Sequence, residues 1–285
     1  MFVMQAVNAC SLSQCNIEGT ALYPLYPLMN SYCYCNTMYT INHCTKVMEV
    51  RAQRNIRRGE EISTRYILPS LEQPARLETI HQAGGFLCAC ARCASASELG
   101  SGYSSLACSE GGCGGSVVVA RPGRLNSDWV CDLCGQVSSR EEVAVNLARC
   151  RALLAGAEGG GAEYLEQVLA SLQQRLHHNH GYCVQTKTKL ISAYAGRENK
   201  TRRELGRQLQ LVEEVLGVLD IIDPGMTPKR GGLLKHLVEL RMKTANIDVE
   251  TGDIDKKTHF AAMRECMMTM KEVMRCLKFS STIVS

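Results

Sequence analysis

Three cysteines at residues 88, 90 and 93 have the close spacing of ligands to a metal ion. Thiolates are favoured ligands of zinc, which takes four protein groups in its structural sites. Cys88, Cys90 and Cys93 supply three of them, so a fourth must come from another part of the chain. The sequence therefore predicts a zinc site that joins this stretch to a distant segment.

A second group of four cysteines lies in the stretches "CSEGGC" and "CDLC". Its members are Cys108, Cys113, Cys131 and Cys134. Two pairs of cysteines followed by glycines, which permit tight turns, are typical of a four-cysteine zinc ribbon. All four ligands are protein groups, so we predict a structural zinc site and interpret the neighbouring Trp129 as a packing residue.

The chain has sixteen cysteines, so their spacing must distinguish metal sites from disulfides. An intracellular protein keeps its thiols reduced, and tight cysteine clusters then favour zinc. The scattered cysteines are predicted to be small buried apolar side chains. They include Cys10, Cys15, Cys44, Cys150, Cys183, Cys266 and Cys276.

Composition indicates a globular protein long enough for two domains, with 285 residues, 45% apolar and 21% charged. The net charge of +4 is small and spread along the chain. Direct nucleic-acid binding, which needs clustered Lys and Arg, is therefore not expected. No signal peptide or long apolar segment is visible, so we expect no membrane association and an intracellular location, in the nucleus and/or cytoplasm.

Helical periodicity begins near residue 139. Breaks occur at 158–163, 178–181, 195–200 and 223–229, and we predict about six helices of roughly 15 to 20 residues in the region. The clearest apolar stripe is Leu205, Leu209, Val212, Leu216 and Leu219, with a stop at Asp223-Pro224-Gly225. A second stripe is predicted to be core: Phe260, Met263, Met267, Met270, Met274 and Leu277.

Three histidines occur close together in "LHHNH" at 176–180. No acidic residue or cysteine lies beside His177, His178 or His180. We therefore predict a role in helix capping or packing rather than metal binding.

Four stretches of the chain form an ordered set: "ALYPL" at 21–25, "NSYCYCNT" at 30–37, "VRAQRNIRRGEEISTRY" at 50–66 and "FLCACARC" at 86–93. Their order resembles that of the SET and MYND family of protein-lysine methyltransferases, in particular its arthropod-like members. The resemblance implies transfer of a methyl group from S-adenosylmethionine to a lysine of a protein substrate. It is strongest from residue 20 to 135 and looser through the helices.

The resemblance also implies roles for single residues. Cys33 becomes the fourth ligand of the first zinc site, with Cys35 as a competing candidate. Tyr66 matches the catalytic tyrosine, Asn30 an amide that contacts the cofactor, and Phe86 an aromatic beside the adenine. Without the family, Tyr66 and Phe86 would be interpreted as packing residues.

Several positions depart from the family pattern. Ser31 and Tyr32 stand where histidine and serine are usual, and Gly84 and Gly85 where an aromatic near the lysine channel is common. The family's Gly-x-Gly cofactor segment and MYND finger are not found upstream. We therefore predict weak or absent methyl transfer by this chain. The alternative is a non-catalytic zinc-binding helical scaffold that binds proteins in transcriptional regulation.

The predicted fold class is α+β. Residues 1–85 are expected to form the C-terminal half of a β-rich SET domain, with unpaired strand edges where the other half would pair. Residues 86–138 are predicted to be a post-SET and four-cysteine zinc-ribbon region. Residues 139–285 are predicted to be an all-α, tetratricopeptide-like domain of antiparallel helices.

Overall fold

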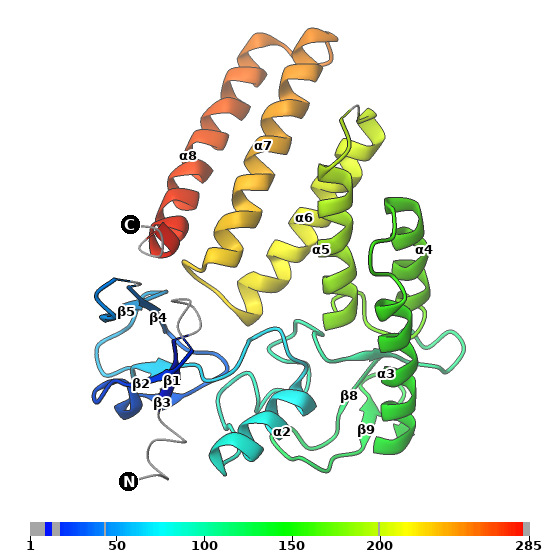
Figure 1. The fold of residues 1–285 in the computed structure, drawn as a ribbon. Helices are drawn as coiled ribbons and strands as arrows, with labels where there is room; N and C mark the ends of the chain where they lie inside the picture. Colours follow the sequence, from blue (N-terminus) through cyan, green and yellow to red (C-terminus); the bar gives the residue numbers. More distant parts are fainter. Residues whose placement is uncertain (1–8, 13–17, 43, 199, 282–285) are drawn as a thin grey trace.

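The structure is a computed structural model that describes residues 9–12, 18–42, 44–198 and 200–281. Short strands come first, a loop-rich region with one helix and one sheet follows, and helices occupy the rest (Figure 1). This order confirms the mixed helix-and-strand class that the sequence predicts. Cys15 lies outside the described residues.

The N-terminal strands form three separate pairs. β1 (Ala9–Ser11) is antiparallel to β2 (Thr20–Leu22), and β4 (Thr37–Ile41) is antiparallel to β5 (Met48–Ala52). After a short 3-10 turn, η2 (Tyr26–Leu28), strand β3 (Asn30–Ser31) runs parallel to β6 (Ser63–Thr64). Among the described residues each of these pairs is a separate two-stranded sheet.

Helix α2 (Gln73–Gly84) follows the strands and was not predicted from the sequence. A proline lies in its first turn, where the missing N–H costs no hydrogen bond, and Gly85 ends it with φ +68°. Its inner face buries Leu77 and Ile80, together with the charged Arg76. The helix therefore presents both apolar and charged groups to the loops that pack on it.

A four-stranded antiparallel sheet follows in the order β10-β9-β8-β7. Its strands are β7 (Leu106–Ala107), β8 (Ser116–Val119), β9 (Trp129–Cys131) and β10 (Val137–Ser138). Trp129 is buried in the largest apolar core, which confirms its interpretation as a packing residue.

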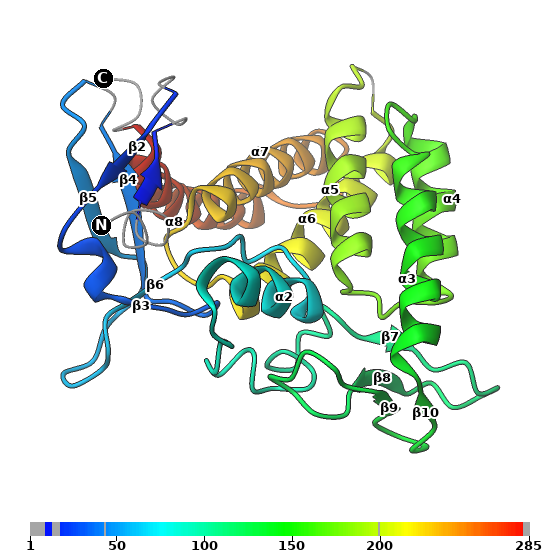
Figure 2. The same cartoon turned by 60° about the horizontal axis from the view of Figure 1, so that its bottom comes forward.

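Six helices occupy the described residues from 140 to 281, as the sequence predicts. They are α3 (Arg140–Ala155), α4 (Ala162–Gln173), α5 (Gly181–Ala195), α6 (Arg202–Ile222), α7 (Pro228–Glu250) and α8 (Lys256–Ser281). Each packs against the next, and two views show the series leading from α3 back toward β4 and β5 (Figures 1 and 2). The last three are longer than predicted, with 21, 23 and 26 residues.

Local sequence signals explain where several helices begin and end. Capping boxes start α3 at Ser139 and α6 at Thr201, in each case with a glutamate three residues later. Helix α6 ends before Asp223, at the predicted stop. Most of the stripe predicted on α6 is buried in the main core, which spans the helices and the four-stranded sheet.

Half of the stripe predicted as core on α8 is exposed and the other half is partly buried, so that prediction was correct only in part. Phe260, Met267 and Met274 are 72%, 66% and 60% exposed, and Cys266, Val273 and Cys276 make the buried face instead. Apolar residues that recur every seven positions lie on one side of a helix. In α8, however, a neighbouring side packs against α7. Met263, Met270 and Leu277 lie at the border and are partly buried.

The histidine cluster lies between α4 and α5, and the predicted capping role is confirmed. His180 is the N-cap of α5, where its Nδ1 accepts from the Tyr182 N–H at 3.1 Å. His177 Nδ1 accepts from the Asn179 N–H, also at 3.1 Å. Burial lowers the pKa of His180 to about 3 and that of His177 to about 4, so both rings are neutral acceptors.

The scattered cysteines agree only in part with the prediction of burial. Cys150, Cys183, Cys266 and Cys276 are buried, whereas Cys10 is partly buried and Cys44 is exposed. Within the described part of the chain, no helix combines the length and the apolar character needed to cross a bilayer.

Candidate metal centres and the Tyr66 cavity

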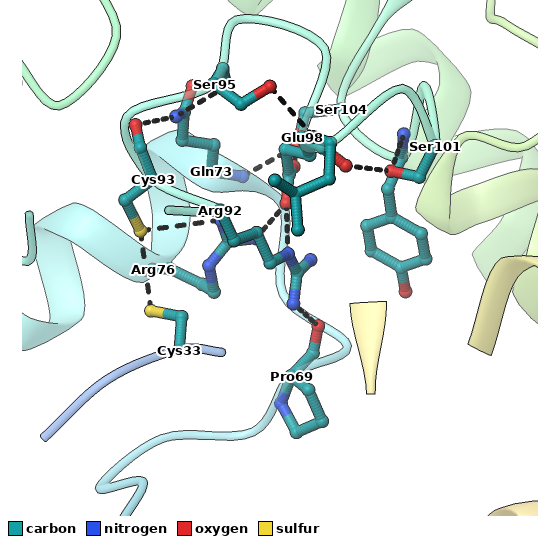
Figure 3. Close-up of polar contacts among 12 residues, drawn as sticks. Cys33, Pro69, Gln73, Arg76, Arg92, Cys93, Ser95, Glu98, Ser101 and Ser104 are labelled. Carbon is teal, nitrogen blue, oxygen red and sulfur yellow. Dashed lines mark hydrogen bonds and ion pairs between the residues drawn. The ribbon is translucent and has the colours of Figure 1, made fainter. Parts of the chain in front are cut away.

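The first cysteine cluster brings Cys33 to the triplet. Figure 3 shows Cys33 beside one member of it, Cys93. Cys33 Sγ lies 3.8 Å from Cys88 Sγ and 3.5 Å from Cys93 Sγ, and all four ligand atoms, including that of Cys90, lie within 4.8 Å of one another. The four side chains are buried. Cys35 is not part of the cluster, because its thiol donates to the Thr37 carbonyl at 3.3 Å.

The second cluster has similar dimensions. Cys108 Sγ lies 3.7 Å from Cys134 Sγ, and Cys113 Sγ lies 3.7 Å from Cys131 Sγ. The backbone turns closely around the sulfurs: a Cβ on Gly115 would lie 2.6 Å from Cys131 Sγ. This cluster is nearer the surface than the first, because Cys134 is exposed.

Both clusters fit the dimensions of a tetrahedral zinc site. Zn–S bonds of about 2.3 Å at tetrahedral angles separate the sulfurs by about 3.8 Å. A disulfide would need about 2.05 Å. Each cluster could therefore hold one zinc ion through four thiolates, with no coordination position left for a substrate.

Hydrogen bonds around Asn36 position the segment that carries Cys33. The buried Asn36 amide donates to the Glu61 carbonyl at 2.8 Å and accepts from the Ser63 N–H at 2.9 Å. These bonds hold the loop after β3 against the start of β6. The asparagine of this motif therefore stabilises the fold.

A cavity of about 490 Å³ lies where the strands meet α5, α6 and α7. Tyr66, at the end of the β6 segment, lines it together with Tyr39, Leu68, Leu219 and Ile222. Tyr66 is 42% exposed, and burial of the rest raises the pKa of its hydroxyl, which is therefore a proton donor at neutral pH. The cavity combines apolar walls with a few polar groups, as small-molecule and side-chain sites do.

The two residues matched to cofactor contacts are not among the described residues that line this cavity. The Asn30 side chain is exposed and donates to Glu61, whose other carboxylate oxygen accepts from the Tyr32 hydroxyl at 2.8 Å. Phe86 follows the end of α2 and is 37% exposed. The structure thus brings Cys33 to its predicted partners but does not gather Asn30, Phe86 and Tyr66 at one cavity.

Sequence reasoning missed a buried charged cluster beside the first cysteine cluster. Arg76 and Arg92 both form ion pairs with Glu98, and the three side chains are fully buried (Figure 3). Charged residues are usually exposed, so composition offered no reason to expect them here. The available signal was the position of Arg92 inside the cysteine triplet.

Comparison with known proteins agrees with the motif order. No family model matches the chain. It is 32% identical over 123 residues to SET domain-containing protein SmydA-8, isoform A, of Drosophila melanogaster, covering 43% of this chain and 26% of that protein. Isoform B is 31% identical over 137 residues, covering 46% of this chain and 30% of the relative.

A fungal protein is also similar. Histone-lysine N-methyltransferase SET5 of Candida glabrata is 36% identical over 78 residues, which cover 27% of this chain and 15% of SET5. The chain therefore spans less than a third of the length of each of these relatives.

Through these matched stretches the chain is similar to SET-domain proteins. The similarities, over part of the chain, support a SET/SMYD-like family.

Proposed function

We propose that the chain carries the zinc-holding, Tyr66-bearing part of a protein-lysine N-methyltransferase. The observation that supports this most strongly is the position of Tyr66, which lines a largely apolar cavity between strands and helices. Lysine must be neutral to accept a methyl group, and an apolar cavity favours a neutral amine. Tyr66 would orient that amine, because such transfers depend mainly on alignment.

The S-adenosylmethionine site is incomplete among the described residues. The Asn30 amide is engaged by Glu61, and Phe86 lies outside the Tyr66 cavity. These residues do not enclose a cofactor as they stand. We therefore propose that methyl transfer by this chain alone is weak or absent.

Two zinc ions would act as structural clamps in this proposal. The first would join Cys33, on the segment after β3, to the triplet after α2, and the second would hold the turns around the four-stranded sheet. Structural zinc contributes to folding because it links segments that few other contacts hold. Residues 1–85, 86–138 and 139–285 would then be three regions, the last a tetratricopeptide-like array.

A non-catalytic scaffold is the second candidate. Six helices packed in sequence order provide an extended surface of the kind that helical repeat proteins use to bind proteins. The incomplete cofactor site favours this function, and its expected partner is also a protein.

Calorimetric titration of the zinc-loaded chain with S-adenosylmethionine, followed by a methylation assay on mixed core histones, tests these proposals. Weak transfer that is lost in Tyr66→Phe and retained in Tyr39→Phe, which alters another tyrosine of the same cavity, would support the catalytic role. Absence of both binding and transfer would favour the scaffold. Transfer that survives Tyr66→Phe would contradict the role of Tyr66.

A further inference from the structure

Two buried arginines share one carboxylate beside the first cysteine cluster (Figure 3). Arg76, on α2, places Nη1 2.7 Å from Glu98 Oε2, and Arg92 contacts the same oxygen through Nε. The Ser104 hydroxyl donates to the other carboxylate oxygen. Two cations and one anion leave an excess of buried positive charge, which is unfavourable unless another negative group lies close.

The first cysteine cluster supplies that negative group. Arg76 Nη2 donates to Cys93 Sγ at 3.7 Å. Four thiolates around one zinc ion carry a net negative charge, so a metal-loaded cluster would balance the guanidinium beside it. A further carboxyl, that of Glu72, interacts with Arg76, but burial raises its pKa and so favours the neutral form.

The same two arginines hold the wall of the Tyr66 cavity, which includes residues 66–70. Arg92 Nη1 donates to the Pro69 carbonyl at 2.8 Å, and Arg76 Nη1 donates to the Leu71 carbonyl at 2.7 Å. The carbonyl between them, on Ser70, accepts from the Tyr103 hydroxyl at 3.0 Å. Buried side chains thus fix three successive carbonyls just after Tyr66.

We propose that Arg76, Glu98 and Arg92 transmit metal occupancy of the first cluster to the wall of the Tyr66 cavity. Bound metal holds Cys93 against Arg76, and the arginines then keep the carbonyls of residues 69–71 in place. Loss of the metal frees Cys93, so that its contact with Arg76 is no longer held in place and the wall is released. Arg76 is therefore a positioning residue, and the cavity is ordered only while the first cluster is loaded.

This inference rests on the proposed zinc site and can be tested without an activity assay. Hydrogen exchange measured by mass spectrometry on the full chain would follow the amides of residues 67–72, with zinc content determined on the same sample. Cys33→Ser should empty the first cluster and speed this exchange by about tenfold or more. Cys134→Ser, which empties only the second cluster, should leave it unchanged.

Substitution of Arg76 tests the link itself. Arg76→Met should speed exchange at residues 67–72 and lower zinc affinity of the first cluster by about 10- to 100-fold, as loss of a residue supporting a metal ligand does. The second cluster, in the same molecule, should keep its affinity. If Arg76→Met fails to fold, Arg76→Lys is the substitute, since it retains the charge but lacks the planar group that spans both contacts.

Tyr103→Phe is the matched control, because it removes the bond to Ser70 without a contact to the cysteines. It should loosen the wall and leave zinc affinity intact. Unchanged exchange in zinc-depleted Cys33→Ser, or a normal first-site affinity in Arg76→Met, would overturn the inference while the zinc site stands. A wild-type chain without metal at the first cluster would instead overturn the proposed zinc clamp and, with it, the inference.

Discussion

Arg65 Nη2 lies 2.6 Å from Asp223 Oδ1, an ion pair between residues 158 positions apart in the chain. Around it, Gln53 Nε2 donates to the Pro224 carbonyl at 3.3 Å, and the Met226 N–H donates to the Gln53 carbonyl at 2.7 Å. This network joins the N-terminal strands to the turn between α6 and α7, directly beside Tyr66. The N-terminal strands are therefore held by contacts with the α6–α7 turn as well as by the first cysteine cluster.

Asp223→Ala should weaken this connection. The substitution leaves the largely buried Arg65 without its carboxylate partner, which we expect to lower the free energy of unfolding by about 2–3 kcal/mol. Urea denaturation would measure the loss. Asp253→Ala is the control, because it breaks an ion pair with Arg202 at the surface, and such pairs contribute little. Equal losses in the two variants would contradict the importance of the Arg65 pair.

Gly225→Ala tests the same turn through the backbone. Gly225 has φ +101°, and a Cβ there would lie 2.1 Å from the Gln53 carbonyl oxygen. We expect a loss of about 2 kcal/mol or more, since both the conformation and the contact become unfavourable. Gly206→Ala, in the middle of α6 with open space around it, should instead stabilise the chain by about 0.5–1 kcal/mol. Thermal unfolding distinguishes the two, and a harmless Gly225→Ala would mean that the turn is adaptable.

Metal content should follow the two cysteine clusters. We expect one zinc ion per cluster in the wild type, loss of one ion in Cys33→Ser, and loss of the other in Cys134→Ser. Cys35→Ser should retain both, because Cys35 faces a carbonyl instead of the cluster. Elemental analysis of dialysed protein measures this directly. A full complement of zinc in Cys33→Ser would refute the assignment of the fourth ligand.

The folded state should become less stable as the pH is lowered, because of His180. Its pKa is about 3 in the folded chain and about 6.5 when unfolded, so below pH 6.5 only the unfolded state takes up the proton. The contribution of His180 to the free energy of unfolding is complete above pH 6.5 and is lost as the pH falls toward 3. The loss is about 2 kcal/mol at pH 5. His180→Asn keeps a capping oxygen but cannot titrate. Unfolding free energies at pH 7.5 and 5 should differ less in this variant; an identical difference would exclude His180 as the cause.

The grouping of the cysteines into two clusters was predictable because residues that could hold a metal occur at short, recognisable spacings. Cys33 required the family resemblance as well, since nothing in its own spacing separates it from Cys35. The end of α6 was predictable because Asp223-Pro224-Gly225 cannot continue a helix.

Other features depended on tertiary contacts that a sequence pattern does not contain. Arg76 and Arg92 look like surface charges until Glu98 and the cysteines are seen around them. On α8, the spacing of Phe260, Met267 and Met274 marks an apolar side, but the choice of the covered side depends on α7. Helix α2 was missed although its early proline and terminal Gly85 are ordinary boundary signals.

The bond between Gln53 and the α6–α7 turn also sets an order of events during synthesis. A ribosome makes residues 53 and 65 long before Asp223. The N-terminal strands therefore emerge before the α6–α7 turn that bonds to them has been made. Contacts this distant in sequence form late in folding. The N-terminal strands should therefore remain loosely organised on the nascent chain, and reach their final packing only after the first residues of α7 have been made.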